Sequence, residues 1–210
     1  PKVVVLETNA IFREVTSTKA FLNKAEGLFS VFKYHDRWKL LQPKSMRLSD
    51  AKTYDRRSKG YLFNMSVSPA DAGEYMKPDD SRETVSKDNI KYITKLRDYC
   101  KKNNAEFVLV SVPSTKNWNC SKHNAVADMA KKLGVDYVDM NTLRQEIPIN
   151  WKTDTRDKGD HLNYFGAVKA TEYVGKYLEE KKIFSDKRKL EDYKEWNSSA
   201  DEFLSSVEKI

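Results

Sequence analysis

Three short apolar runs along the chain have the composition of strands that are buried on both faces. Residues 2–6 and 107–112 are rich in β-branched side chains and end at polar residues or proline, and residues 136–140 form a weaker third run. Apolar runs of this length without polar alternation are typical of parallel strands, because helices cover both faces of a parallel sheet. We therefore predict strands over these three ranges.

Between and after these runs, the apolar residues recur at helical spacing. Intervals of three and four residues separate the apolar side chains over 88–102, 122–133 and 164–182, which predicts three amphipathic helices. Gly134 stands where the second helix should end, and Asn163 stands at the N-cap position of the third. Both residues therefore support the predicted helix boundaries.

The order of these elements predicts the fold class. The strand at 107–112, the helix at 122–133 and the strand at 136–140 form a βαβ crossover, which joins parallel strands. We expect an α/β fold with three layers, in which helices lie on both sides of a mostly parallel sheet. Residues 1–184 should form this domain, and residues 185–210, which are charged and Ser-rich with a few apolar anchors, should form a helical extension packed on it.

Composition narrows the class of protein. The chain has 210 residues, and its 38 Lys and Arg against 31 Asp and Glu give a net charge of +7. These cations are interleaved with acidic residues, whereas a nucleic-acid-binding protein has a basic stripe or a recognisable module, so we expect no nucleic-acid partner. No apolar run approaches the ~18 residues that span a bilayer. Because the chain opens at Pro1 directly on a strand, we expect a fragment of a longer secreted or membrane-anchored protein. We expect this fragment to be soluble and monomeric and to work outside the cytoplasm or at the cell surface.

The cysteines give no sign of a metal site. Cys100 and Cys120 are the only two, and the chain contains no CxxC and no Cys/His pair at ligand spacing. We therefore expect neither a bound metal nor a cofactor. A disulfide between the two cysteines is geometrically possible, but nothing in the sequence indicates one.

The best candidate for chemistry is His161, in the polar segment 151–163 before the last predicted helix. Asp157 and Asp160 lie four residues and one residue before it, and a neighbouring carboxylate can fix the tautomer of an imidazole and stabilise its protonated form. The alternative is a loop histidine with a structural role. His35 and His123 are weaker candidates, and His123 is expected at the surface.

The loops that follow the predicted strands are also candidates, because open parallel sheets bind ligands at the carboxyl ends of their strands. After the first strand come Glu7, Thr8 and Asn9, and after the second come Asn117 and Trp118. A tryptophan flanked by amides is a common carbohydrate platform, although Trp118 packed in the core is an equal alternative.

The segment Gly159–Ala167 (GDHLNYFGA) resembles the last conserved block of SGNH/GDSL-type hydrolases and of the related acyltransferases of alginate O-acetylation and teichoic-acid D-alanylation. Residues 59–63 (KGYLF) are similar to a segment of the alginate-type members, and so is the strand at 107–112 with Pro113 and Lys116 after it. The resemblance implies a flavodoxin-like, SGNH-type fold and a triad in which a hydroxyl, an imidazole and a carboxylate transfer an acyl group.

Two positions depart from the family pattern. The family aspartate lies two or three residues before the histidine, where this chain has Gly159 and Lys158, so Asp157 or Asp160 must replace it. The family serine follows the first strand, where this chain has Asn9. Thr8 would then serve as the nucleophile, or else it is an ordinary turn hydroxyl.

Three further residues would complete such a site. The Asn9 amide and the backbone N–H groups near Gly60 would stabilise an oxyanion, and Glu7 would bind a sugar hydroxyl. The resulting hypothesis is an esterase or O-acyltransferase that acts on an acylated carbohydrate or glycopolymer of the cell surface. The alternative is a domain of the same fold without catalytic activity, which binds glycan or partners a membrane-bound acyltransferase. A nucleotide-binding flavodoxin-like domain is a third possibility, but no strand is followed by a Gly-rich phosphate loop.

Overall fold

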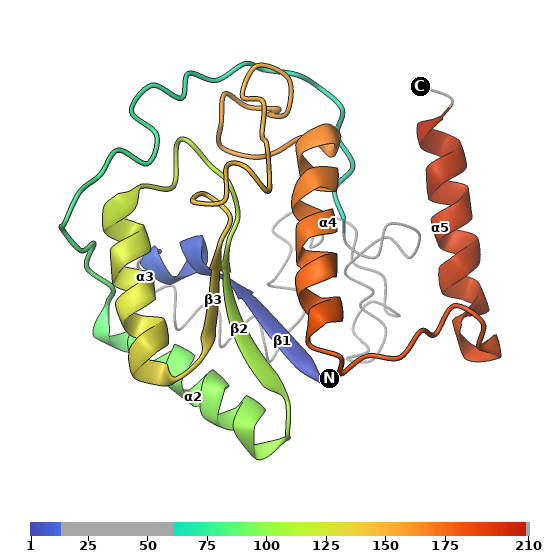
Figure 1. Ribbon diagram of the computed structural model, residues 1–210, viewed down its shortest axis with the longest axis horizontal. Coiled ribbons are helices and arrows are strands. Elements are labelled where there is room, and N and C mark those ends of the chain that lie inside the picture. The colour runs from blue at the N-terminus through green and yellow to red at the C-terminus, as the bar shows by residue number, and fades with distance from the viewer. Residues whose placement is uncertain (14–60, 209–210) are drawn as a thin grey trace, which may run out of the picture. The chain divides into compact units, whose positions relative to one another are not determined.

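The computed structural model describes residues 1–13 and 61–208 (Figure 1). The chain divides into two compact units, of which the first comprises Pro1–Arg13 with Phe63–Lys187 and the second comprises Glu14–Leu62 with Arg188–Ile210. The sheet and every candidate site residue in the described part of the chain belong to the first unit. Gly60 and His35 lie outside the described residues.

The first unit is built on a three-stranded parallel sheet in the order β1-β2-β3. Its strands are β1 (Val3–Glu7), β2 (Glu106–Ser111) and β3 (Asp136–Asp139). Val108 of β2 lies opposite both Val5 of β1 and Asp136 of β3 in the two registers. The α/β class and the parallel sheet are thus confirmed, with each strand within one residue of its predicted bounds.

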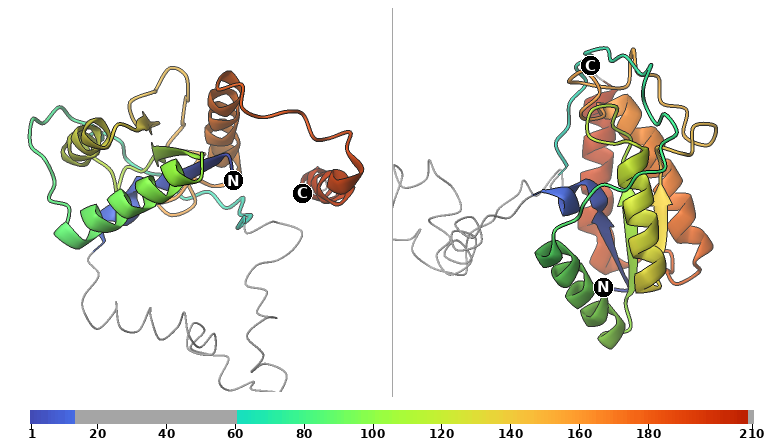
Figure 2. Two further views of the ribbon diagram at one scale, coloured as in Figure 1. Left: turned by 90° about the horizontal axis from the view of Figure 1, so that it is seen from below. Right: turned by 90° about the vertical axis from the view of Figure 1, so that its left-hand side faces the viewer.

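Alternate residues of β2 supply two separate cores. Phe107 and Leu109 pack with the helices α2 (Lys87–Lys102) and α3 (Cys120–Leu133). Val108 packs on the opposite face with α4 (Tyr164–Glu180), so helices lie on both sides of the sheet (Figure 2). This burial of both faces explains why the β2 sequence has no polar alternation.

The same expectation is wrong for β1 in the described part of the chain. Val5 is 45% exposed, because β1 is an edge strand of the sheet formed by the described residues. The apolar run therefore predicted the position of this strand correctly, but the prediction that both of its faces are buried is wrong.

Side chains and glycine fix the helix ends. Asn119 caps α3 by accepting the Lys122 N–H at 2.9 Å, so α3 begins two residues before its predicted start. Gly134 ends it in the left-handed conformation with φ of 63°, and Asn163 caps α4 by accepting the Gly166 N–H at 3.2 Å. The terminator and the N-cap predicted from the sequence are both confirmed.

The two cysteines are both free thiols. Cys100 is buried in α2, and Cys120 is the first residue of α3 and is partly exposed. The possible disulfide between them is therefore not formed.

The described part of the second unit is mostly helical. A short turn of 3-10 helix at Glu191–Tyr193 leads into α5 (Lys194–Val207), and the Phe203 ring meets the Tyr61 ring edge to face with 6.1 Å between centroids. The expected C-terminal helix is confirmed, whereas its packing on the domain of residues 1–184 stays a prediction. Among the described helices, none has both the length and the apolar character that crossing a membrane requires.

Replacing Asn163 should reveal how strongly α4 is held at its start. Its Nδ2 donates to the Thr153 and Ser66 carbonyls at 2.7 and 3.2 Å, and the residue is 1% exposed. We expect Asn163→Ala to lower the free energy of unfolding by about 1–3 kcal/mol in urea titrations. Asn163→Asp should also destabilise, because its carboxylate keeps the cap but faces two carbonyl oxygens.

Asn119→Asp is the matched control. Asn119 acts only as an acceptor in the hydrogen bonds of the described residues, and a negative charge is favourable at a helix N-terminus. This variant should be as stable as the parent. An Asn163→Asp variant that matched it would show that the two Nδ2 contacts contribute little.

Candidate active site

His161 and Asp157 form a close imidazole–carboxylate pair. The Nδ1 atom of His161 lies 2.6 Å from Asp157 Oδ2, and the His161 backbone N–H donates to Asp157 Oδ1, also at 2.6 Å. One carboxylate therefore fixes both the ring and the backbone of the histidine. A carboxylate only accepts, so Nδ1 carries the proton and Nε2 is left as the basic nitrogen. The His161 side chain is 56% exposed, so the imidazole is open to solvent.

The pair is held at the end of a tight loop. Thr155 and Leu162 form an isolated antiparallel bridge, and the Thr155 hydroxyl donates to the His161 carbonyl at 3.0 Å while accepting the Gly159 N–H at 2.8 Å. Gly159 has a φ of 91° and leaves no room for a side chain, since a Cβ there would lie 1.9 Å from Thr115 Oγ1. The loop therefore needs glycine at this position.

The loop after β2 packs against the same pair. Lys116 Nζ donates to the Asp157 carbonyl at 3.0 Å, and Asn117 Nδ2 donates to Asp160 Oδ1. Asp160 Oδ2 lies 3.7 Å from His161 Nδ1. The structure thus brings together Asn117, Asp157, Asp160 and His161, although they come from two distant loops.

The Asp157 carboxyl is suited to remain ionised beside an imidazolium. Partial burial tends to raise its pKa, but hydrogen bonds from the His161 backbone and ring outweigh that effect and hold the pKa below its usual value. A carboxylate that stays charged stabilises the protonated imidazole.

Thr8 does not join this pair in the described part of the chain. It is fully buried in the 3-10 helix Thr8–Phe12 after β1, and its hydroxyl lies 2.6 Å from Ser111 Oγ. Ser111 Oγ in turn lies 2.9 Å from the Tyr137 hydroxyl. Thr8 is 0% exposed, and its hydroxyl is hydrogen-bonded to a row of other hydroxyls, so a substrate cannot reach it. The structure therefore supports the alternative of a structural hydroxyl and not the predicted nucleophile.

Glu7 and Asn9 are used within the same turn. Glu7 Oε1 accepts the Asn9 N–H at 3.0 Å and so caps the 3-10 helix. Asn9 Oδ1 accepts from Lys122 Nζ at 3.5 Å. No hydrogen bond among the described residues connects either side chain to His161, so their roles toward a substrate stay predictions.

Trp118 is a core residue, so of its two equal alternatives the core position is confirmed and the role as a carbohydrate platform is wrong. It is 3% exposed, its indole N–H donates to Asp139 Oδ2 at 3.0 Å, and its ring meets Phe12 edge to face with 6.0 Å between centroids. A side chain covered in this way presents no face for a sugar.

A second imidazole–carboxylate pair was missed at the sequence level. His123 Nδ1 lies 2.6 Å from Asp139 Oδ2, and Asp139 is 5% exposed. Oδ2 also accepts from the Tyr137 hydroxyl at 3.0 Å, and Oδ1 accepts the backbone and side-chain N–H groups of Asn141 at 2.9 and 2.6 Å. His123 was expected at the surface. The signal available in the sequence was an aspartate at the carboxyl end of a predicted strand, directly before the apolar Met140.

These contacts determine the charge of Asp139. Burial tends to raise its pKa, but hydrogen bonds from His123, Asn141 and Trp118 outweigh that effect and lower it. Burial next to this carboxylate raises the pKa of the Tyr137 hydroxyl. Asp139 is thus a buried anion whose neighbours all donate to it.

With Asp160, the exposed pair forms a group of three side chains that could bind a cation. One ligand atom from each of Asp157, Asp160 and His161 lies within 4.8 Å of the others. Two atoms bound to one cation at about 2.1 Å each are separated by about 3 Å. The 2.6 Å between His161 Nδ1 and Asp157 Oδ2 therefore fits a shared proton better than a shared cation.

Comparisons of the chain with protein-family models, with curated proteins and with solved structures gave no match. The function is therefore inferred from the site itself. That site consists of an exposed imidazole fixed by Asp157 and bordered by Asn117 and Asp160.

Replacing Asp139 should change stability in a pH-dependent way. Because its pKa is lowered on folding, its contribution is complete above the unfolded pKa of about 3.9 and is lost as the pH falls through the folded value. We expect Asp139→Asn to lower the free energy of unfolding by about 1–3 kcal/mol at neutral pH. In urea titrations the gap to the parent should shrink below about pH 3.9. A gap that stayed constant with pH would contradict an ionised Asp139.

Replacing Gly159 should disturb the loop that holds the pair. We expect Gly159→Ala to destabilise the protein by about 1–3 kcal/mol, because of the positive φ and the close Thr115 hydroxyl. Gly175→Ala is the control, since a Cβ at Gly175 in α4 meets nothing within 4 Å. It should stabilise by about 0.5–1 kcal/mol. Thermal unfolding of both variants checks this, and equal effects would show that the loop adapts to a side chain.

Proposed function

We propose that this chain is an SGNH-like esterase or O-acyltransferase that acts on an acylated glycan or glycopolymer, with His161 and Asp157 as its general acid–base pair. The observation that carries the proposal is the contact of 2.6 Å between His161 Nδ1 and Asp157 Oδ2 with the imidazole open to solvent. Imidazoles held in this way by a carboxylate are the bases of acyl-transfer enzymes.

The chemistry assigns one step to each group. His161 Nε2 removes the proton from an attacking hydroxyl as that oxygen bonds to the ester carbonyl carbon. Asp157 stabilises the imidazolium that forms, and the imidazolium then donates its proton to the departing alkoxide as the ester bond breaks. Asn117 and Asp160, at the border of the pair, supply an amide and a carboxylate for the hydroxyls of a sugar.

The fold is consistent with this proposal. A parallel sheet with α2 and α3 on one face and α4 on the other suits a three-layer, flavodoxin-like arrangement of the SGNH type, and the pair lies in the loop that enters α4. We place the activity outside the cytoplasm or at the cell surface, where acylated glycopolymers occur.

A second candidate function is a glycan-binding domain or a partner of a membrane-bound acyltransferase. The observation in its favour is the burial of Thr8. In the described part of the chain, moreover, no side-chain hydroxyl forms a hydrogen bond to the His161 ring. Without an activated hydroxyl of its own, the pair would position a ligand and form no acyl-enzyme.

Turnover of a chromogenic acetyl ester and of an acetylated polysaccharide tests the proposal. We expect His161→Ala and Asp157→Asn each to lower kcat/KM by at least ~10²-fold while thermal unfolding is little changed, because general acid–base catalysis contributes about 10²–10⁴. Thr8→Val is the control and should retain turnover, since its hydroxyl is buried. Unchanged turnover in the His161 variant would refute the assignment.

Labelling with a fluorophosphonate probe separates the two candidate functions. A covalent adduct that depends on His161, mapped by mass spectrometry, would identify the hydroxyl that the pair activates anywhere in the chain. Polysaccharide binding without labelling or ester cleavage would instead support the binding domain.

A further inference from the structure

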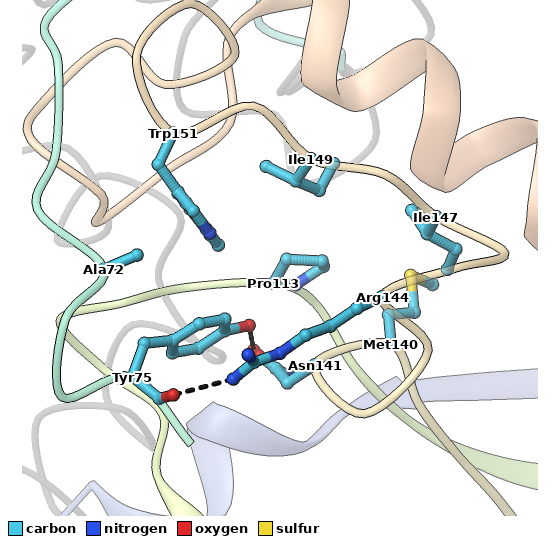
Figure 3. Close-up of a pocket in the computed structure, with 9 residues that line it drawn as sticks. All are labelled: Ala72, Tyr75, Pro113, Met140, Asn141, Arg144, Ile147, Ile149 and Trp151. Atoms are coloured by element: carbon cyan, nitrogen blue, oxygen red, sulfur yellow. Dashed lines mark hydrogen bonds between the residues drawn. The ribbon is translucent and has the colours of Figure 1, made fainter. Parts of the chain in front are cut away.

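A pocket of about 200 Å³ lies beside the loop that follows β3 (Figure 3). Its lining is mainly aromatic and aliphatic, and includes Tyr75, Pro113, Ile149 and Trp151. The close-up shows Trp151 from above and Tyr75 from below pointing toward the same space, with Pro113 beside them. The proposed acyl-transfer chemistry does not use any of these residues.

The aromatic wall of this pocket is held in place. The Tyr75 and Trp151 rings meet edge to face with 5.1 Å between centroids, and the Tyr75 hydroxyl donates to Asn141 Oδ1 at 2.5 Å. Asn141 is 1% exposed and is itself bound to the buried Asp139. The pocket is therefore already formed without a ligand, which lowers the entropy cost of binding.

Arg144 is the only charged residue among the described residues that line the pocket. Its Nη2 donates to the Tyr75 carbonyl at 2.7 Å, and its guanidinium carbon lies 5.3 Å from the centre of the Tyr75 ring. These contacts orient the guanidinium along one side of the pocket, as Figure 3 shows. A guanidinium has five N–H donors, so one anchoring bond leaves a fork of donors for an anion.

We propose that this pocket binds a small organic carboxylate whose apolar part is a single ring or a short branched chain. The volume suits a group of that size, and the aromatic and aliphatic walls suit its apolar part. The single guanidinium matches one negative charge in the bidentate geometry that arginine forms with carboxylates. A phosphate monoester carries up to two charges and is more strongly hydrated, so a single arginine, itself exposed at the edge of the pocket, compensates it less well.

The pocket is connected to the candidate active site through Ser114. The Ser114 backbone N–H donates to Asn141 Oδ1 at 3.1 Å, and its hydroxyl donates to the Gly159 carbonyl at 3.0 Å. One residue therefore joins the wall of the pocket to the loop that holds Asp157 and His161. The carboxylate site is nevertheless independent of the proposed catalysis, because its contacts involve neither member of that pair.

Titration of the intact chain with benzoate tests the proposal. We expect a Kd of about 1 mM, typical of a ligand with few heavy atoms, measured by calorimetry and by the shift of the Trp151 indole N–H signal in NMR spectra. That signal is assigned by its loss in Trp151→Phe. Benzamide, which has the same shape without the charge, should bind at least about tenfold more weakly, and phenyl phosphate should bind more weakly than benzoate.

Two arginine variants isolate the charge and its geometry. Arg144→Gln should weaken benzoate binding at least about tenfold and leave benzamide binding unchanged, and Arg144→Lys should fall between the parent and Arg144→Gln. Arg82→Gln, which changes an exposed arginine that does not line the pocket, should bind like the parent. NMR dispersion confirms that each variant is folded.

Three outcomes would show that the pocket does not recognise a carboxylate through Arg144. They are no shift of the Trp151 signal at several times the expected Kd, equal binding of benzoate and benzamide, and benzoate binding that Arg144→Gln does not weaken. Tighter binding of phenyl phosphate than of benzoate would assign the pocket to phosphate monoesters instead. All of these readouts stand whether or not the chain cleaves esters.

Discussion

The arrangement of the loops at the carboxyl ends of the strands depends on the buried carboxylate of Asp139. Five hydrogen bonds reach it, from His123, Trp118 and Tyr137 on one oxygen and from two N–H groups of Asn141 on the other. A buried charge is costly unless it is fully hydrogen-bonded. The carboxylate therefore holds α3, the loop after β2 and the loop after β3 at fixed positions. The same anion orients the hydroxyls next to it. Because the Tyr137 hydroxyl donates its only proton to Asp139, it must accept a hydrogen bond from the Ser111 hydroxyl. Ser111 has then used its own proton, so it must accept from the Thr8 hydroxyl.

The influence of Asp139 extends to both proposed sites. Asn141, which donates to Asp139, accepts hydrogen bonds from the Tyr75 hydroxyl and from the Ser114 backbone N–H. The Ser114 hydroxyl in turn donates to the Gly159 carbonyl, in the loop that holds His161. The pocket and the exposed imidazole–carboxylate pair are thus attached to one rigid hydrogen-bonded centre. Fixed supports of this kind allow a small domain to keep reactive groups in place on otherwise exposed loops.

Features that depend on residues close together in the sequence could be predicted, whereas features that depend on residues far apart in the sequence could not. The strands, the helices, the Gly134 terminator and the Asn163 cap follow from neighbouring residues, and so does the pairing of His161 with an aspartate four positions away. Contacts between distant residues were not predictable in the same way. The bond between Trp118 and Asp139 joins a loop to a strand end, and Thr8 is buried by its partner Ser111, 103 residues further along the chain. No periodicity records such partners, so the sequence left both residues with two alternatives each, an exposed role and a structural one, and the distant contacts favour the structural one.

The two histidine–aspartate pairs share one contact distance of 2.6 Å and differ in their surroundings. The His123 and Asp139 side chains are 30% and 2% exposed, and the His161 and Asp157 side chains are 56% and 37% exposed. A geometric template built only on the separation of imidazole nitrogen and carboxylate oxygen would find two equivalent centres in this chain. Solvent access distinguishes them, and most clearly at the carboxylate: Asp139 is closed to solvent, whereas Asp157 is open to it. Within the described residues, accessible surface therefore separates the two pairs where interatomic separation does not.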